Sequence, residues 1–144
     1  MKVSSKGHYG LLALAELAEN YKQRRAVQVK EIAGNQQIPV QYLGQIMVLL
    51  KRGHLVHAAR GPSGGYILAR PPETISVKEI LAVLEGPAIG FELKAQMHSR
   101  SISRVTQRLI ESWARAVRAM EMVLEETTLA DLCKPEAGAL MYYI

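Results

Sequence analysis

A glycine-rich turn between two short runs of strand-forming residues constrains this fold more than any other feature. The runs are residues 55–60 and 66–70, and the turn between them is Gly61-Pro62-Ser63-Gly64-Gly65. Such a turn predicts a tight hairpin, because glycine alone enters positive φ without steric cost. A helical run over residues 40–52 precedes it. A helix followed by a hairpin with arginine beside its tip is typical of a winged helix-turn-helix; the alternative is an ordinary surface hairpin.

The rest of the chain is predicted to be helical. Of its 144 residues 49% are hydrophobic, but only one is Phe and one Trp, so the core must be aliphatic, which favours helices. Ser76 and Glu79 have the spacing of a capping box, and Thr128 resembles another helix start. Val27 and Val29 alternate with polar neighbours and could form a short extended piece. Helices are expected over residues 9–21, 29–36, 40–52, from Ser76 to 85, 103–126, and from Thr128 to about 133.

The charge is unevenly distributed along the chain. Residues 1–70 hold ten Lys or Arg and three Glu, whereas residues 71–144 hold eight Lys or Arg and ten acidic residues. A basic half joined to a mildly acidic half suggests a polyanion-binding head and a partner-binding tail. No apolar run is long enough for a membrane span, and the single cysteine fits a reducing compartment. We therefore expect a cytoplasmic protein without a membrane partner.

The third predicted helix, residues 40–52, has two distinct faces. Leu43, Ile46, Met47 and Leu50 form an apolar stripe, so the opposite face is exposed. Glutamine on such a face can pair bidentately with adenine in a major groove. We expect the DNA contacts on this face and on the hairpin, with Lys6 beside them. The candidate DNA-binding residues are Lys6, Gln41, Tyr42, Gly44, Gln45, Lys51, Arg52, Arg60, Gly61, Ser63, Gly64, Gly65 and Tyr66.

The long helix over residues 103–126 is predicted to dimerise. Apolar residues recur along it at spacings of four and three, the a/d pattern of a coiled coil. A second apolar column lies beside the first, so the helix could also fold back on its own head. We expect the a/d side to meet a second copy of the chain. The candidate dimerisation residues are Leu109, Trp113, Ala116, Val117, Met120 and Val123.

Signatures of catalysis and of metal binding are missing from the sequence. The glycine-rich turn has no following Gly-Lys-Ser/Thr, so it is not a phosphate-binding P-loop. The four histidines are scattered, and His54 and His57 have no third ligand nearby. We therefore expect neither an enzyme nor a metal site. Cys133 is interpreted as an inert, partly buried thiol, with a redox-sensing thiol as the alternative.

Several ordered motifs resemble one known family. They are Lys6-Gly7-His8-Tyr9, Val29-Lys30-Glu31-Ile32-Ala33, Tyr42-Leu43-Gly44-Gln45, Arg60 to Pro71, Ile75-Ser76-Val77 and Val83-Leu84-Glu85-Gly86-Pro87. This series is similar to the Rrf-two family of bacterial transcription regulators, which includes the iron–sulfur cluster regulator and the cysteine-metabolism repressor. The resemblance implies a homodimeric winged-helix regulator that binds a partly palindromic operator. It places base reading at Gln41, Gly44 and Gln45, and wing contacts at Arg60 and the following turn.

The sequence departs from that family at three points. Cluster-binding members carry three cysteines before the long helix, whereas residues 88–103 contain none and offer only His98, so we expect no iron–sulfur cluster and no other cofactor. Many members have Glu at the position of Gly44, so we expect a different or looser operator sequence here. His8 replaces the usual Arg, so we expect one phosphate contact to be weaker or pH-dependent.

The sequence thus predicts a mainly α fold with a small β-hairpin. Its parts are a winged helix-turn-helix head (1–86), a linker or effector-loop region (87–102), and a dimerisation helix with a short C-terminal helix (103–144). The favoured function is a dimeric transcription regulator, such as a repressor, that binds double-stranded DNA and responds to an unidentified small effector or protein partner. The alternatives are a winged-helix protein-interaction module and a redox sensor based on Cys133. The operator, the regulated genes, the sign of regulation and the signal do not follow from the sequence.

Overall fold

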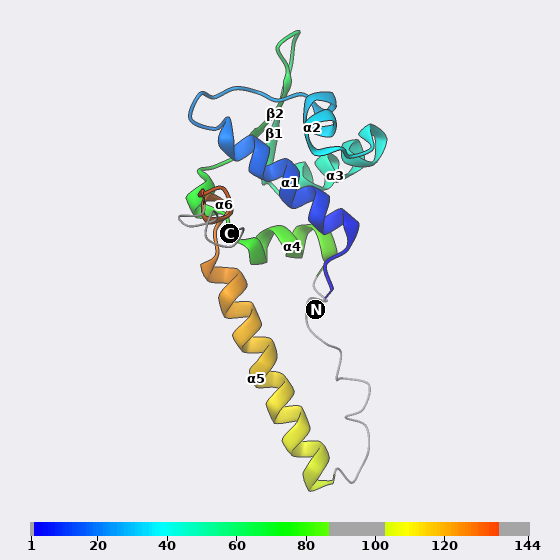
Figure 1. Cartoon of the computed structure of the whole chain (residues 1–144), viewed down its shortest axis with the longest axis vertical. Coiled ribbons are helices and arrows are strands. Elements are labelled where there is room, and N and C mark those ends of the chain that lie inside the picture. The colour runs from blue at the N-terminus through cyan, green and yellow to red at the C-terminus, as the bar shows by residue number, and fades with distance from the viewer. Residues whose placement is uncertain (1, 87–102, 136–144) are drawn as a thin grey trace, which may run out of the picture.

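The computed structural model describes residues 2–86 and 103–135 (Figure 1). Most of the described chain is helical, and its two strands form one antiparallel hairpin. This confirms the predicted fold class. In chain order the elements are α1 (Ser5–Glu19), α2 (Val29–Gln36), α3 (Val40–Arg52), β1 (Val56–Ala59), β2 (Gly65–Leu68), a 3-10 turn η1 (Pro72–Thr74), α4 (Val77–Glu85), α5 (Arg104–Glu126) and α6 (Leu129–Leu132).

Helix α1 lies at the centre of the head and contacts α2, α3, α4, β2 and α6. It begins four residues earlier than the sequence predicted and ends two residues earlier. The reason is a cap at its start: the Ser4 hydroxyl accepts a hydrogen bond from the Gly7 amide at 3.2 Å. The Glu85 carboxylate in turn accepts from the Ser4 amide at 3.0 Å and from its hydroxyl at 2.5 Å. A negative charge at a helix N-terminus is stabilising, so α4 holds the start of α1.

Helices α2 and α3 form the helix-turn-helix with the predicted bounds. The turn between them depends on Gln37, which ends α2 in the left-handed region at φ 55°, and on Pro39, which precedes α3. Between these residues Ile38 is only 4% exposed, so the turn is fixed to the core by its own side chain. The apolar stripe predicted on α3 is confirmed, since Leu43, Ile46, Met47 and Leu50 are all fully buried.

The predicted hairpin forms, but its loop lies one residue earlier than the expected turn at residues 61–65, because Gly65 already belongs to β2. A third segment extends its sheet. Val56 pairs with Leu68 and Ala59 with Gly65, so residues 60–64 make the loop. Gly61 has φ 102° and Gly65 φ 141°, conformations that side-chain-bearing residues rarely adopt. Val27 forms a bridge with Tyr66 through two backbone hydrogen bonds of 2.9 Å each. The expected extended piece is therefore confirmed at Val27, whereas Val29 begins α2.

The two predicted helix caps differ in outcome. Ser76 caps α4, because its hydroxyl accepts from the Glu79 amide at 3.1 Å. The Glu79 carboxylate, however, forms an ion pair with Arg70, so this half of the predicted capping box is wrong. At α6 the box is complete: the Thr128 hydroxyl accepts from the Asp131 amide at 3.1 Å, and the Asp131 carboxylate accepts from the Thr128 amide at 3.0 Å.

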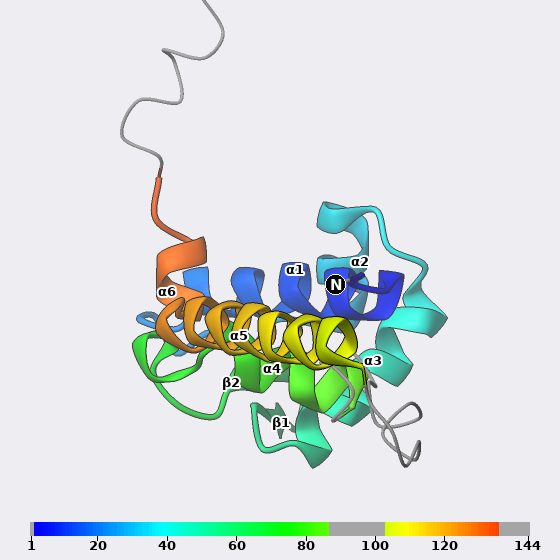
Figure 2. The ribbon, with the colours of Figure 1, turned by 90° about the horizontal axis from the view of Figure 1, so that it is seen from below.

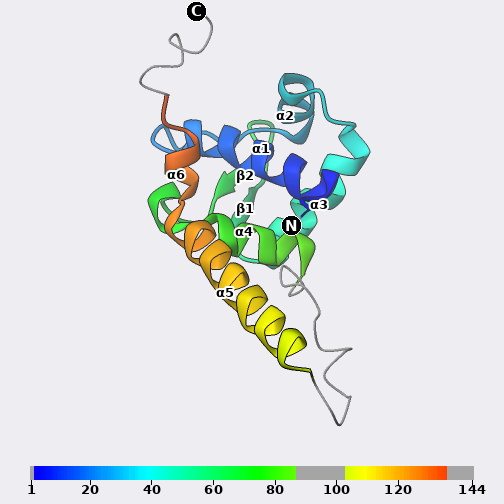
Figure 3. The same ribbon diagram turned by 60° about the horizontal axis from the view of Figure 1, so that its bottom comes forward.

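Helix α5 projects from the side of the head opposite the hairpin (Figures 1 and 3). Its C-terminal end stays close to α4, where Lys78 pairs with Glu125 at 3.4 Å. The chain then returns to the head, since Leu129 of α6 is fully buried in the core and α6 lies at one end of α1 (Figure 2). Residues 136–144 and the predicted effector-loop region, including His98, lie outside the described residues. None of the described helices is long and apolar enough to cross a membrane.

Candidate nucleic-acid interface

The exposed face of α3 has no acidic residue and ends in two cations. Gln41, Gln45 and Val48 are exposed, and Lys51 and Arg52 follow in the last turn. Each step along this face, from Gln41 to Gln45, to Val48 and then to Lys51 or Arg52, is three or four residues, so these residues form one stripe along the helix. The stripe is long enough to lie in a DNA major groove. It carries amide and cationic side chains, and it has no carboxylate that would repel the DNA phosphates.

Gly44 leaves a shallow depression in that stripe. A Cβ built at this position meets no heavy atom within 4 Å, so packing inside the chain does not require a glycine. Glycine in a helix interior costs roughly 1 kcal/mol relative to alanine. The absence of a side chain brings the α3 backbone to the surface between Gln41 and Gln45.

A pair of aromatic rings packs the start of α1 against α3. Tyr42 meets Tyr9 edge to face, with ring centroids 5.8 Å apart and an interplanar angle of 79°. His8 adjoins Tyr9, with centroids 6.0 Å apart. Tyr42 is thus half-buried against α1 rather than freely exposed, and Lys6 is half-buried in the first turn of α1. The Tyr9–Tyr42 contact fixes the basic N-terminal end of α1 next to the first turn of α3.

The hairpin loop separates into an exposed tip and a structural base. Arg60, Gly61, Pro62 and Ser63 are exposed. Gly64 is buried, and a Cβ there would lie 2.6 Å from the Ala59 carbonyl oxygen. At the base, the backbone of Tyr66 is already bonded to Val27 and its ring packs against the core. Gly64, Gly65 and Tyr66 therefore shape the hairpin. The exposed residues that a partner could contact are Arg60 and the tip, residues 61–63.

The predicted dimerisation residues form an apolar surface on α5. Leu109 is 54% exposed, Trp113 38% and Val123 62%, and no residue of α5 is buried. Ala116 is also exposed, whereas Val117 and Met120 are half-buried. Apolar side chains at this spacing are the pattern of a helix that packs against another helix.

The sulfur of Cys133 faces the head rather than the surface. Its thiol lies 3.7 Å from the Ala15 carbonyl oxygen and is half-buried. Burial raises the pKa of the Cys133 thiol, and the charge of Glu19 raises it further. A raised pKa lowers the thiolate fraction, and the thiolate is the reactive form. Among residues 2–86 and 103–135 no three His, Cys, Asp or Glu side chains gather in a way that could hold a metal ion.

Two features of the surface were not selected from the sequence. Val48 is 43% exposed between the glutamines and the cations of α3; its exposure was visible in the helical pattern, but apolar residues on a polar face carry little signal alone. A basic pocket between the α1–α2 loop and the hairpin involves Arg24 and His57. Its residues are far apart in the chain, so no local pattern could have indicated it.

A helical head in which α2 and α3 form a helix-turn-helix, α3 ends in two cations and the hairpin carries Arg60 beside its tip defines a winged helix-turn-helix protein of the DNA-binding class. Comparison with known proteins agrees. The family model described as "Rrf2: Iron-dependent Transcriptional regulator" matches residues 3–135. The chain belongs to the Rrf2 family of transcriptional regulators.

Individual relatives match along nearly the whole chain. The HTH-type transcriptional regulator IscR of Cereibacter sphaeroides is 36% identical over 141 residues, covering 94% of this chain and 89% of that protein. The solved structure of CymR, the global cysteine regulator of B. subtilis, has a TM-score of 0.79 at 34% identity and covers 92% of this chain and 96% of that one. T. potens IscR has a TM-score of 0.75 at 37% identity, covering 99% and 97%. These relatives are regulators and not enzymes, which confirms the non-catalytic expectation.

Proposed function

We propose that this chain is a homodimeric, sequence-specific DNA-binding regulator that inserts α3 into the major groove and lays its hairpin on the adjacent backbone or minor groove. The observation that carries the proposal is the exposed face of α3, a helix that contains two glutamines, two terminal cations and no acidic residue. Binding to the operator places its action in the cytoplasm, where bacterial DNA lies.

Base reading is assigned to the middle of α3. Gln41 and Gln45 are one turn apart and exposed, and each can pair with the N6 and N7 edge of an adenine. Gly44 lets the helix approach the base pairs closely between them. Val48 continues the same face and is suited to an apolar contact with a thymine methyl group. The expected site is therefore rich in A·T pairs at the positions that α3 reaches.

Phosphate contacts are assigned to the cations that surround this face. Lys51 and Arg52 lie at the end of α3, Lys6 at the start of α1, and Arg60 at the hairpin. Phosphate contacts fix the register of a protein on the duplex and make its affinity depend on salt. In the tip, the exposed Gly61 and Ser63 allow the backbone to approach the duplex, while the buried Gly64 shapes the loop behind them and Tyr42 supports the first turn of α3.

We propose that two copies pair through α5, because this helix is too long for its own head to cover. It has 23 residues, about 34 Å, and its a/d side chains are largely exposed. Its charges also differ along its length. In the first two-thirds Arg104, Arg108, Arg115 and Arg118 outnumber the one acidic residue, Glu111, whereas Glu121, Glu125 and Glu126 lie at its end. An antiparallel pairing would bring the basic part of each helix near the acidic end of the other.

The iron dependence in the family description does not fit the donor set of this chain. Iron–sulfur clusters are held mainly by cysteine thiolates. This sequence contains one cysteine, and its thiol is directed at the α1 backbone. We therefore propose a regulator without a three-cysteine cluster. Reconstitution with iron and sulfide under anaerobic conditions is expected to leave the protein without visible absorption, and a stable brown cluster would contradict this.

Binding to duplex DNA with matched variants tests the proposal. Arg60→Ala should weaken binding to all duplexes and reduce the salt slope by about one unit. Gln45→Ala should relax preference at one base position, at a cost of about 1–3 kcal/mol on the preferred duplex. Lys134→Ala, which removes an exposed cation at α6, is the charge-matched control and should change neither quantity. Unchanged affinity of Arg60→Ala would reject the hairpin assignment and favour a protein-interaction head.

Dimerisation has its own matched pair of variants on α5. Leu109→Asp places a charge on the a/d side, and Met122→Asp places the same charge on another side of the helix at similar exposure, 54% against 58%. Sedimentation equilibrium should find Leu109→Asp monomeric and Met122→Asp dimeric. If both variants stay dimeric, α5 does not pair through its a/d side.

A further inference from the structure

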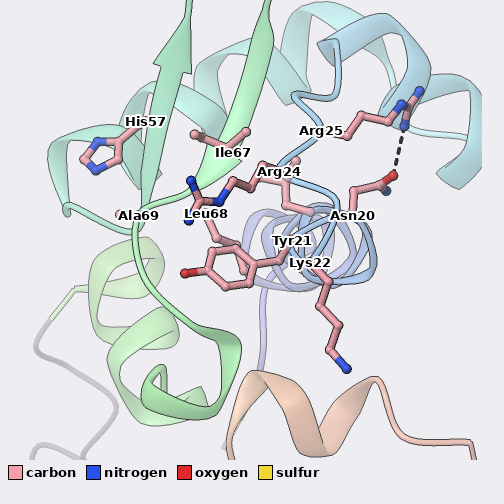
Figure 4. Close-up of a pocket in the computed structure, with 10 residues that line it drawn as sticks. Asn20, Tyr21, Lys22, Arg24, Arg25, His57, Ile67, Leu68 and Ala69 are labelled. Carbon is pink, nitrogen blue, oxygen red and sulfur yellow. Dashed lines mark hydrogen bonds between the residues drawn. The ribbon is translucent and has the colours of Figure 1, made fainter.

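A concave site lies away from α3 and the hairpin tip, between the α1–α2 loop and the base of the hairpin. Its volume is about 390 Å³, within the usual range for small-molecule sites. It is lined by Leu17, Asn20, Tyr21, Lys22, Arg24, Arg25, His57, Ile67, Leu68 and Ala69 (Figure 4). None of these residues belongs to the candidate DNA-binding set.

The pocket has an apolar floor and a cationic rim. Leu17 and Leu68 are buried, and Tyr21 and Ile67 are half-buried, so they offer apolar surface inside the hollow. Lys and Arg side chains and one histidine surround it, and no Asp or Glu lines it. An apolar body with one negative group is the ligand chemistry that such a lining complements.

Arg24 is the cation best placed to contact such a ligand. Figure 4 shows Arg24 lying across the pocket, with its guanidinium on the side of Leu68 and His57. In the described part of the chain no carboxylate pairs with Arg24, whereas its neighbour Arg25 is bound to Glu31 at 2.6 Å and to Asn20 at 3.0 Å. The backbone of Arg24 is left-handed at φ 51°, uncommon for a residue other than glycine. Such conformations concentrate at functional sites.

The pocket also touches the strand that leads to the hairpin tip. Ile67 and Leu68 belong to β2, and β2 is tied to the end of the α1–α2 segment by the Val27–Tyr66 bridge. We propose that this pocket binds a small organic anion, a carboxylate or phosphate ester with an apolar body, through Arg24. A bound anion would link the α1–α2 loop to β2, close to the segment that carries Arg60. This inference does not rest on the proposed function, because ligand binding is measured without DNA.

Phenyl phosphate is a suitable probe, since it joins an aromatic ring to an anion. Its binding to the full chain would be followed by backbone amide NMR shifts and by titration calorimetry. Phenyl phosphate should move the signals of residues 20–25 and 67–69, and it should bind at least about tenfold more tightly than either phenol or inorganic phosphate. Arg24→Gln should weaken binding about tenfold or more, whereas Lys30→Gln, an exposed α2 cation outside the pocket, should not.

Three results would overturn the proposal. Phenol or inorganic phosphate binding as tightly as phenyl phosphate would show that the rim and the floor do not act together. Shifts centred on α3 and residues 60–63 would place the anion at the DNA interface instead. The third result concerns the source of the anion, and duplex binding is measured in buffer without organic anions. If Arg24→Gln weakens duplex binding as much as it weakens phenyl phosphate binding, Arg24 contacts a DNA phosphate. Retained duplex affinity with lost phenyl phosphate binding supports a free ligand.

Discussion

Replacing Gly65 with alanine should destabilise the head through a clash that no side chain can relieve. A Cβ at this position would lie 2.4 Å from the Val27 carbonyl oxygen, 2.5 Å from its carbon and 2.9 Å from the Gln28 nitrogen. All three atoms are backbone, and Val27 is fully buried. Gly65 also has φ 141°, which alanine rarely adopts.

The magnitude follows from the two ways in which the chain can respond. If the backbone stays, strain of about 1–3 kcal/mol is stored at position 65. If Val27 moves away, its two hydrogen bonds with Tyr66 are lost, at about 0.5–1.5 kcal/mol each. Since some of both is expected, Gly65→Ala should lower the free energy of unfolding by about 2–4 kcal/mol.

Urea unfolding at one fixed protein concentration measures this loss. Gly34→Ala is the matched control, because a Cβ there meets nothing within 4 Å and the residue lies in α2. The control should gain about 0.5–1 kcal/mol from helix propensity. If the free energy of unfolding of Gly65→Ala lies within about 0.5 kcal/mol of that of the unchanged chain, the contact with Val27 does not constrain the hairpin.

Further variants test the buried and capping groups of the head. Glu16 is 7% exposed, and its carboxylate accepts hydrogen bonds from Asn35 at 2.5 Å and from Gln36 at 3.0 Å. Glu16→Ala should therefore lower the free energy of unfolding in urea by about 1.5–3 kcal/mol. A smaller loss than that of the exposed Glu19→Ala would contradict this prediction. Hydrogen bonds from Lys134, then from Thr128, lower the pKa of Asp131 from 3.8 to about 2. Its ionised form therefore adds stability that is present above pH 3.8 and lost as the pH falls toward 2; Asp131→Asn should flatten the stability profile in that window and leave it unchanged if the cap is not formed. The raised pKa of Cys133 predicts alkylation at pH 8 that is slower in the folded chain than in urea, and equal rates would refute its burial.

Features that depend on near neighbours in the chain were predictable from the sequence. The bounds of α2 and α3, the cap at Ser76 and the tight loop at residues 60–64 follow from local spacing and from glycine chemistry. The apolar stripe of α3 was also predictable, because a helix with one buried face repeats its apolar residues at a fixed period.

Features that depend on distant residues were not predictable. The early start of α1 relies on Glu85, 81 positions away from Ser4. Glu79 was expected to complete a cap, but Arg70 competes for its carboxylate. The basic pocket joins a loop near Arg24 to strand residues near Ile67. Sequence spacing carries no information on such contacts, so only the folded chain reveals them.

Selection of bound duplexes from a random pool tests whether paired heads present two α3 helices to one DNA duplex. We expect two related half-sites in inverted orientation, with centres about one helical turn, ~34 Å, apart. We also expect Gln45→Ala to lose preference at one position in each half-site. A pool that shows no enrichment, or a single unpaired site bound by one copy of the chain, would rule out this mode of binding.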